Sequence, residues 1–420
     1  MPSSKIPETL KICLISEKFP IIGRTHARGF IAPIARGLAK AGHQVSVIAW
    51  DNPMGEKEIE PEGIKTYFVS GANSSRIELF PRRVHQKFSE LHSKEPFHIV
   101  HSLTHSAIRV GFEKKALGIA VAYDVTATRM AEIFSIIGLA ENTVASQLKT
   151  AYKVVTRFLR SFFMRDRLIL KNADGVFVHS PQQMLALERY YLYPEKKTFN
   201  IPYGIEIEDL SQRQGSGELR QKLNIPKSAK IAVTVSDMVE KQDVINILLA
   251  FQAVAAKKPS SHLIIVGHGP AFKDIEYEML NLALGSHVVL VGAVPAYEIS
   301  SYIDLANVYI YIGGRTSGYD PNLLEAMIQE KIIIGSEVSP IATVVEDGVD
   351  GYLIRPADVS ALSHLLLGLF LDHIQPGSMG ENARAKALNI FDTNKMIQET
   401  LAAYATILQK TPWVRFPEQD

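Results

Sequence analysis

The sequence VYIYIGGRTSGYDPNLLEAMIQEKIIIGS, residues 308–336, decides the fold. It holds a β-branched and aromatic run, a glycine-containing loop, a helical segment and a second apolar run. Two strands joined through a helix form a βαβ unit, in which the strands lie parallel. Parallel sheets of this kind bind ligands at the carboxyl ends of their strands. The stretch therefore predicts a buried parallel sheet with a ligand-binding edge.

The same alternation of strands and helices extends outward in both directions. In the second half, strands are expected at 231–236, 262–267, 288–292, 308–313, 331–336 and 351–356, with a helix over 242–257. In the first half, strands are expected at 11–16, 44–50, 64–70, 97–103, 121–125 and 175–180, with a helix over 30–42. The polar stretch 207–230 is interpreted as a linker, and 393–410 as a closing helix. The sequence thus predicts an α/β protein with two Rossmann-like domains: 1–206, 207–390, and a C-terminal helix and tail over 391–420.

Composition narrows the class of protein. Of the 420 residues, 46% are hydrophobic and 21% are charged, which is typical of globular domains. Lys and Arg number 45 against 44 Asp and Glu, a net charge of +1, which argues against a nucleic-acid binder. The single cysteine, Cys13, lies in an apolar run and is expected to be a small buried hydrophobe. No apolar run has the length of a membrane span, so we expect a cytoplasmic protein.

Two Rossmann-like halves raise the question of a nicotinamide-dependent dehydrogenase. That class needs three glycines in a G-x-G-x-x-G turn after a strand. After strand 11–16 the loop offers only Gly23 before Gly29, and after strand 262–267 the pair Gly267 and Gly269 lacks the third glycine. The sequence therefore disfavours a dinucleotide cofactor.

Several stretches together resemble the retaining glycosyltransferases of family 4, from about residue 10 to 408 and in that family's order. They are FPIIGRTHARGFIAPIARGLAKAGHQVSVI (19–48), ADGVFVHS (173–180), IPYGIE (201–206), IIVGHGP (264–270), ANVYIYIGGRTSGYDPNLLEAM (306–327) and VVEDGVDGYLI (344–354). The resemblance implies the GT-B fold, in which two Rossmann-like domains face a cleft. It also implies sugar transfer from a nucleoside-diphosphate donor without a metal ion or another cofactor.

The resemblance carries over to this chain residue by residue, with departures. Lys241 stands at the family's phosphate-binding lysine, whereas Asp237 stands where an arginine is expected. Glu325 matches the second of two glutamates, the one that holds the ribose, whereas Ser317 occupies the first. Asp320, three residues later, is the candidate to supply the missing carboxylate to the sugar hydroxyls. Lys241, Glu325 and Asp320 are therefore the candidate catalytic residues.

The donor is expected to contact glycine loops, replacement cations and the start of the helix near 321. The helix N-terminus and its loop provide N–H groups for a diphosphate. Arg24 and Arg315 are expected to replace part of the positive charge that Asp237 removes. The candidate donor-binding residues are Gly23, Arg24, Gly267, Arg315, Ser317, Gly318, Tyr319, Pro321 and Asn322.

The acceptor is expected to bind in the first domain. The family often places a histidine after the strand that here reads AVAYDV, and this chain has Thr126 there. His101 and His105 flank the end of strand 97–103 and, with Thr126, are the candidate acceptor-binding residues. The alternative is that both histidines are ordinary polar loop residues.

A basic stretch, residues 146–171, holds seven Lys or Arg and one acid. As a helix it places Lys149, Lys153, Arg157 and Arg160 on one face and apolar side chains on the adjoining face. That pattern fits a helix lying on an anionic membrane surface. It fits equally an ordinary domain helix with a solvated charged face.

The sequence therefore favours a hexosyltransferase that moves a sugar from a nucleoside diphosphate to a hydroxyl of a polysaccharide or glycolipid, with retention. The expected partners are a nucleotide sugar and a glycan or lipid-linked acceptor, with peripheral membrane contact at the inner face through 146–171 and no nucleic acid. The alternative is a non-catalytic, glycosyltransferase-like partner or glycan-binding subunit with a degenerate donor site. A two-domain epimerase of nucleotide sugars shares the architecture but lacks motif support.

Overall fold

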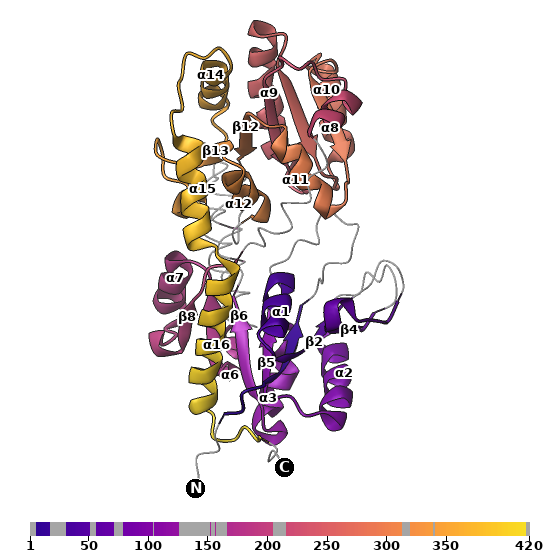
Figure 1. The fold of residues 1–420 in the computed structure, drawn as a ribbon, viewed down its shortest axis with the longest axis vertical. Coiled ribbons are helices and arrows are strands. Elements are labelled where there is room, and N and C mark those ends of the chain that lie inside the picture. Colours follow the sequence, from indigo (N-terminus) through magenta and orange to yellow (C-terminus); the bar gives the residue numbers. More distant parts are fainter. Residues whose placement is uncertain are drawn as a thin grey trace. The chain divides into compact units, whose positions relative to one another are not determined.

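The computed structural model describes residues 6–16, 31–50, 56–70, 79–103, 105–125, 152, 156, 166–204, 216–312, 320–338 and 341–416. The chain divides into two compact units. The first contains 1–20, 29–204 and 393–420, and the second contains 21–28 and 205–392. Each unit is an α/β layer structure (Figure 1). The predicted fold class of two Rossmann-like α/β units with parallel sheets is confirmed.

The first unit is built on an eight-stranded sheet of order β3-β4-β2-β1-β5-β6-β7-β8. Every neighbouring pair is parallel except β3 and β4. Its strands are β1 (Lys11–Ile15), β2 (Gln44–Ala49), β3 (Glu58–Ile59), β4 (Lys65–Phe68), β5 (Ile99–Ser102), β6 (Ala120–Asp124), β7 (Gly175–Val178) and β8 (Thr198–Asn200). Its helices are α1 (Ile31–Lys40), α2 (Phe80–Lys94), α3 (Ile108–Leu117), α6 (Asp166–Asn172), α7 (Pro181–Tyr191) and α16 (Thr393–Gln409).

The second unit is built on a six-stranded parallel sheet of order β11-β10-β9-β12-β13-β14. Its strands are β9 (Ile231–Val235), β10 (His262–Val266), β11 (Val288–Gly292), β12 (Val308–Tyr311), β13 (Ile332–Ser336) and β14 (Tyr352–Ile354). Its helices are α8 (Ser216–Lys222), α9 (Lys241–Lys257), α10 (Phe272–Asn281), α11 (Ala296–Asp304), α12 (Pro321–Ile328), α13 (Ile341–Val344), α14 (Val359–Phe370) and α15 (Met379–Ile390).

The central strands are apolar along their whole length because helices cover both faces of each sheet. In β1, Ile12, Cys13, Leu14 and Ile15 are all fully buried. Burial also raises the pKa of the Cys13 thiol above its ordinary value, so Cys13 is the buried hydrophobe that its context predicts. The long apolar runs of the sequence therefore follow from a sheet enclosed on both faces.

One predicted element differs in the structure. The stretch 207–230 was interpreted as a linker, yet its residues 216–222 form helix α8. The segment SGELRQK contains Glu, Leu, Arg, Gln and Lys, which all favour helix formation. Ile225, just after α8, is buried, so this part of the stretch belongs to the second unit rather than joining the units as an open linker.

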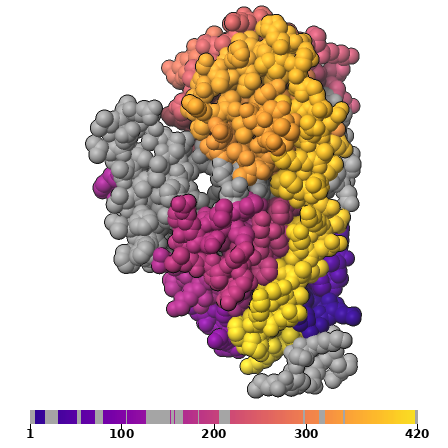
Figure 2. Space-filling view, turned by 90° about the vertical axis from the view of Figure 1, so that its left-hand side faces the viewer, coloured from indigo at the N-terminus to yellow at the C-terminus, as the bar shows by residue number. Residues whose placement is uncertain are grey.

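The C-terminal helix α16 belongs to the first unit and packs against α1 (Figures 1 and 2). Two glycines allow its close approach: a Cβ added to Gly37 of α1 would overlap Ile397, and one added to Gly175 of β7 would overlap Ile407. Tyr404, Ile407 and Leu408 of α16 are buried. The last helix of the chain thus completes the core of the first unit.

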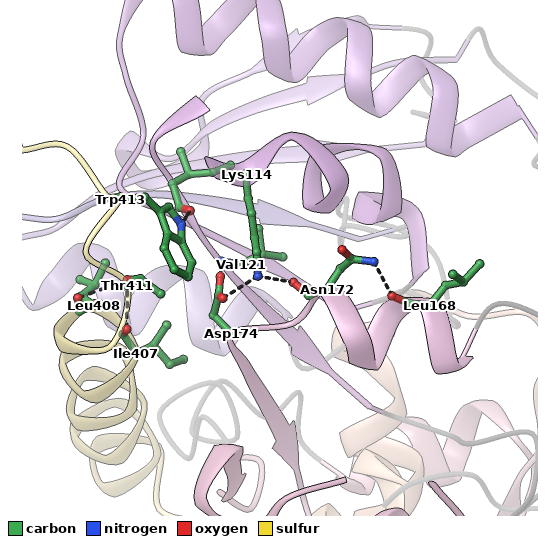
Figure 3. A network of polar contacts seen from close by, with 10 residues as sticks. Lys114, Val121, Leu168, Asn172, Asp174, Ile407, Leu408, Thr411 and Trp413 are labelled. Atoms are coloured by element: carbon green, nitrogen blue, oxygen red, sulfur yellow. Dashed lines mark hydrogen bonds and ion pairs between the residues drawn. The ribbon is translucent and has the colours of Figure 1, made fainter. Parts of the chain in front are cut away.

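The chain after α16 is anchored to the first unit by the indole of Trp413, which lies beside a buried ion pair (Figure 3). Lys114 Nζ lies 2.5 Å from Asp174 Oδ1 and donates to the carbonyl of Asn172 at 2.7 Å. Trp413 donates its Nε1–H to the carbonyl of Ile119 at 3.0 Å, and its ring lies 5.4 Å from Lys114 Nζ. These contacts hold the tail of the chain on α3 and β6.

Candidate functional site

The candidate site of the second unit lies at the carboxyl edge of its sheet, where β9 is flanked by β10 and β12. The chain passes from β9 to β10 on one side, and β12 returns to the other side of β9. Such a reversal of strand order leaves a crevice above the carboxyl ends, where open α/β sheets bind their ligands. The loops after β9, β10 and β12 carry the residues that the sequence singled out in this half of the chain.

The loop after β9 is a tight turn fixed by its own side chains. Ser236 Oγ accepts from the N–H of Met238 at 3.0 Å, and Asp237 Oδ1 accepts from the N–H of Val239 at 3.1 Å. Met238 is fully buried and has a φ of +52°, a conformation that side chains rarely adopt. Asp237, the residue at the family's arginine position, is exposed. The turn therefore presents a carboxylate at this edge.

Gly267 and Gly269 bring the loop after β10 directly against the loop after β9. A Cβ on Gly267 would overlap the carbonyl of Ser236, and one on Gly269 would overlap the carbonyl of Asp237. Gly267 also has a φ of +125°, which favours glycine. The predicted donor-binding Gly267 is therefore required by the close approach of two backbones.

Lys241 is the first residue of α9, and its exposed ammonium lies 3.2 Å from Asp274 Oδ2 of α10. The Lys241 and Asp274 side chains are 57% and 60% exposed. Exposed ion pairs of this kind contribute about 0–1 kcal/mol, because both charges stay hydrated. An anionic ligand can therefore replace Asp274 as the partner of Lys241 at small cost.

Asp320 is the N-cap of α12, with Pro321 in its first turn. Its Oδ1 accepts from the N–H of Asn322 at 2.7 Å, and the Tyr311 hydroxyl also donates to its carboxylate. Burial raises the pKa of Asp320 above its ordinary value, and the bonds from Asn322 and Tyr311 oppose the rise. The carboxylate expected to hold sugar hydroxyls thus already caps a helix.

Glu325 lies in the second turn of α12 and is 1% exposed. Together with Asp320 it adds to the effect of burial, which raises the pKa of the Tyr309 hydroxyl well above its ordinary value. Tyr309 belongs to β12, so the carboxylate of Glu325 lies close to that strand. The structure therefore buries Glu325 near β12.

Some expected site residues lie outside the described residues. These are Gly23, Arg24, Thr126, Arg315, Ser317, Gly318 and Tyr319. The basic stretch 146–171 is described only at 152, 156 and 166–171, where Ile169 and Leu170 of α6 are buried. The side chains of α6 that are described fit an ordinary domain helix.

The first unit carries a buried polar cluster at the carboxyl ends of β5, β6 and β7. Asp124 Oδ1 lies 2.6 Å from His179 Nε2 and accepts from the Tyr203 hydroxyl at 2.8 Å. His179 Nδ1 donates to the carbonyl of Ile201 at 2.8 Å, since a carbonyl can only accept. The short contact from His179 to Asp124 therefore joins the ends of β6 and β7 inside the first unit.

His101 belongs to this cluster, contrary to its expected place in an acceptor site. It is 1% exposed, its Nδ1 lies 2.7 Å from the Tyr404 hydroxyl, and its Nε2 lies 4.0 Å from Asp124 Oδ2. Burial lowers the pKa of His101 to about 4. Because its ring is enclosed by Phe177 and Tyr404, His101 lines no surface. His105, in the short 3₁₀ helix His105–Ala107, is half-buried.

Sequence reasoning missed Asp124, His179, Tyr203 and Tyr404. Asp124 ends β6 and His179 directly follows β7, so both are polar residues at the end of an apolar run. That position was a usable indication, since the carboxyl ends of parallel strands meet at one edge. Among the described residues, no group of three or more His, Cys, Asp or Glu is arranged to hold a metal ion. None of the described helices is long and apolar enough to cross a membrane.

Two solved structures share the fold of this chain. Sucrose-phosphate synthase from Thermosynechococcus elongatus matches with a TM-score of 0.77 and 21% identity, over 95% of this chain and 99% of that one. Anabaena HepE in complex with UDP-glucose matches with a TM-score of 0.69 and 18% identity, over 94% and 99%. The fold therefore defines the class: two α/β units of the GT-B type.

Family models identify the two units more closely. Residues 216–386 match the model "Glycosyl transferases group 1", and residues 28–204 match "Glycosyl transferase 4-like domain". Each of the two units therefore matches a glycosyltransferase domain model.

A curated relative is N-acetyl-alpha-D-glucosaminyl L-malate synthase of Bacillus anthracis, 23% identical over 222 residues, which are 53% of this chain and 57% of that protein. The chain spans about half the length of the curated relatives it matches.

Proposed function

We propose that the protein is a retaining hexosyltransferase that moves a sugar from a nucleoside-diphosphate donor to a hydroxyl acceptor, without a metal ion. One observation carries the proposal: Lys241 begins the helix that follows β9, and Glu325 lies in the helix that follows the neighbouring strand β12, in a unit that matches a glycosyltransferase family model. The neighbour HepE is described in complex with UDP-glucose, which supports a nucleotide sugar as the donor here.

In this proposal Lys241 compensates the charge of the leaving group. Negative charge builds on the phosphate oxygens as the glycosidic bond breaks, and a fixed cation stabilises that charge. Lys241 is exposed, and within the described part of the chain it forms the weak pair with Asp274, so it can turn to a phosphate. Glu325 holds the ribose, and the loop before α12 supplies N–H groups. Asp320 is proposed to contact the sugar hydroxyls with the same carboxylate that caps the helix.

The acceptor is proposed to be a glycan or a lipid-linked sugar bound by the first unit, where His105 and Thr126 remain the candidate contacts. We place the reaction in the cytoplasm, with contact to the inner membrane surface through 146–171. The group 1 match supports the reaction class, whereas the acceptor rests on the sequence resemblance.

A second candidate function is a non-catalytic partner that keeps the fold. It is favoured by Asp237, whose exposed carboxylate stands where the family has a cation. Under this alternative, Asp237→Arg restores a missing charge and nucleoside-diphosphate affinity rises. Under the catalytic proposal, other cations already compensate the negative charge of Asp237. The same substitution then lowers activity.

The deciding experiment has two stages. First, UDP, GDP, ADP and their glucose derivatives are titrated into the purified protein by calorimetry, with and without EDTA. Second, radiolabelled donors are incubated with glycan and lipid acceptors, and the anomeric configuration of any product is read by NMR. Transfer with retention in EDTA supports the whole proposal. Binding without transfer to any acceptor supports the non-catalytic partner, and inversion or a metal requirement overturns that part of the proposal.

A further inference from the structure

An exposed imidazole stands beside the candidate donor edge. His268 lies between Gly267 and Gly269, whose backbones contact the carbonyls of Ser236 and Asp237. Because both glycines are needed for that contact, His268 supplies the only side chain of this Gly-His-Gly turn. The turn after β10 therefore presents one ring at the edge where β9, β10 and β12 end.

One face of that ring is covered by an aromatic side chain. His268 stacks on Phe272, with ring centroids 4.8 Å apart and an angle of 22° between the planes. Phe272 is the first residue of α10 and packs against the hydrophobic core of the second unit, which fixes its position. His268 itself is exposed. An exposed ring that is held in place by a second ring can bind a further flat ring by stacking.

The neighbouring loop adds an apolar side chain. Val239 is 60% exposed, although the residue before it, Met238, is fully buried. The carbonyl of Met238 accepts from the N–H of Ala271 at 3.1 Å, so the loop of Val239 is bonded to the loop that follows His268. The bond from Val239 N–H to Asp237 Oδ1 fixes the turn. An aromatic ring and an apolar side chain are thus held on two bonded loops.

We infer that His268 stacks on the nucleobase of the donor nucleotide, with Val239 beside it. This inference rests on the proposed function and adds the base-recognition site to it. The charge of Asp237 favours the base, rather than a phosphate, as the part of the donor beside His268. Its exposed carboxylate, on the adjacent loop, repels a phosphate but not a neutral heterocycle. The diphosphate then lies toward the exposed ammonium of Lys241, and the base lies over the His268 ring.

The test uses three substitutions at His268 and a matched control. His268→Ala removes the ring, His268→Phe keeps a ring without hydrogen-bonding nitrogens, and His268→Lys keeps a cation without a ring. His364→Ala on α14 is the control, because His364 is also exposed but lies away from the carboxyl edge. Circular dichroism and melting curves check that each variant folds. Affinities for UDP, GDP, ADP and inorganic pyrophosphate are measured by calorimetry.

Stacking on a base predicts a loss of about tenfold to a hundredfold in nucleotide affinity for His268→Ala and for His268→Lys. His268→Phe and His364→Ala stay within about threefold of the original chain, and pyrophosphate affinity is unchanged in all variants. If His268→Lys keeps the original nucleotide affinity and His268→Phe does not, His268 contacts a phosphate and the stacking inference is wrong. Unchanged nucleotide affinity in His268→Ala overturns the inference alone. Absence of nucleotide binding by the unaltered chain overturns the proposed function and this inference with it.

Discussion

The Tyr404 hydroxyl lies 2.7 Å from Nδ1 of His101, although 303 residues separate the two along the chain. Tyr404 belongs to the last helix, α16, and His101 to the central strand β5. Both side chains are buried, and Phe177 of β7 contacts both rings. The C-terminal helix is therefore joined to the polar cluster at the carboxyl edge of the first sheet.

Acid should destabilise the fold through His101. Burial lowers its pKa from 6.5 to about 4, so the folded protein favours the neutral ring. For a lowered pKa the stability is fully present above pH 6.5 and is lost as the pH falls toward 4, by about 3 kcal/mol. Urea unfolding at several pH values measures this change.

His101→Gln keeps a polar partner for Tyr404 but cannot be protonated, so its stability should fall less between pH 6.5 and 4. His98 has a pKa lowered to about 4 by burial as well, so a residual slope is expected. Equal slopes for the original chain and His101→Gln would show that His101 does not cause the acid sensitivity.

Loss of the Lys114 ammonium should destabilise the first unit strongly. The Lys114 and Asp174 side chains are 12% and 6% exposed, so Lys114→Ala leaves a buried carboxylate without its cation. Such a loss costs about 3–5 kcal/mol, which chemical denaturation measures. The matched control is Lys94→Ala, because Lys94 forms an exposed pair with Glu90 and should change stability by less than about 1 kcal/mol. A similar effect of both substitutions would contradict the role of burial.

A methyl group on Gly269 should disturb the candidate donor site at the loops after β9 and β10. Because the added Cβ overlaps the carbonyl of Asp237, Gly269→Ala must separate the loops after β9 and β10. We expect a loss of about 1–3 kcal/mol in stability and at least a tenfold loss in nucleotide affinity. Gly285→Ala is the control, since nothing lies within 4 Å of its added Cβ. If a folded Gly269→Ala protein binds nucleotide normally, the contact between the two loops is not needed for nucleotide binding.

Lys241→Ala should abolish transfer while the protein stays folded. Removing one charge-assisted phosphate contact lowers the rate by about 30- to 1000-fold, or about 2–4 kcal/mol of transition-state stabilisation. Stability should change little, because the pair with Asp274 is exposed. Lys257→Ala, in the last turn of the same helix, is the control. Initial rates with a saturating acceptor measure the effect, and a normal rate for Lys241→Ala would remove Lys241 from the mechanism.

Asp320→Asn should lower the affinity for the nucleotide sugar more than the affinity for the free nucleoside diphosphate, since only the nucleotide sugar carries hexose hydroxyls. Asn caps helices about as well as Asp, so stability should hold. Asp358→Asn is the matched control, because Asp358 caps α14 by the same kind of bond, to the N–H of Ala361. Calorimetry with both ligands measures the difference. Equal weakening of the two ligands would leave Asp320 with its capping role alone.

Short edge elements were the hardest part of the fold to predict. Strands β3 and β8 have two and three residues, and their side chains are exposed or half-buried. They carry no apolar run because the edge of a sheet is not enclosed on both faces. Helix α8 was missed for a related reason, since its polar sequence resembles a linker and only its helix-favouring residues distinguish it.

The sequence by itself determined the parallel sheets and the order of their strands and helices. Strands buried on both faces must be apolar throughout, and that pattern is local and readable. Only the tertiary structure decided which polar side chains are buried together. It places Tyr404 against His101 and His179 against Asp124. These contacts depend on the packing of distant segments, since a polar residue's burial and partners are set by whatever element covers it.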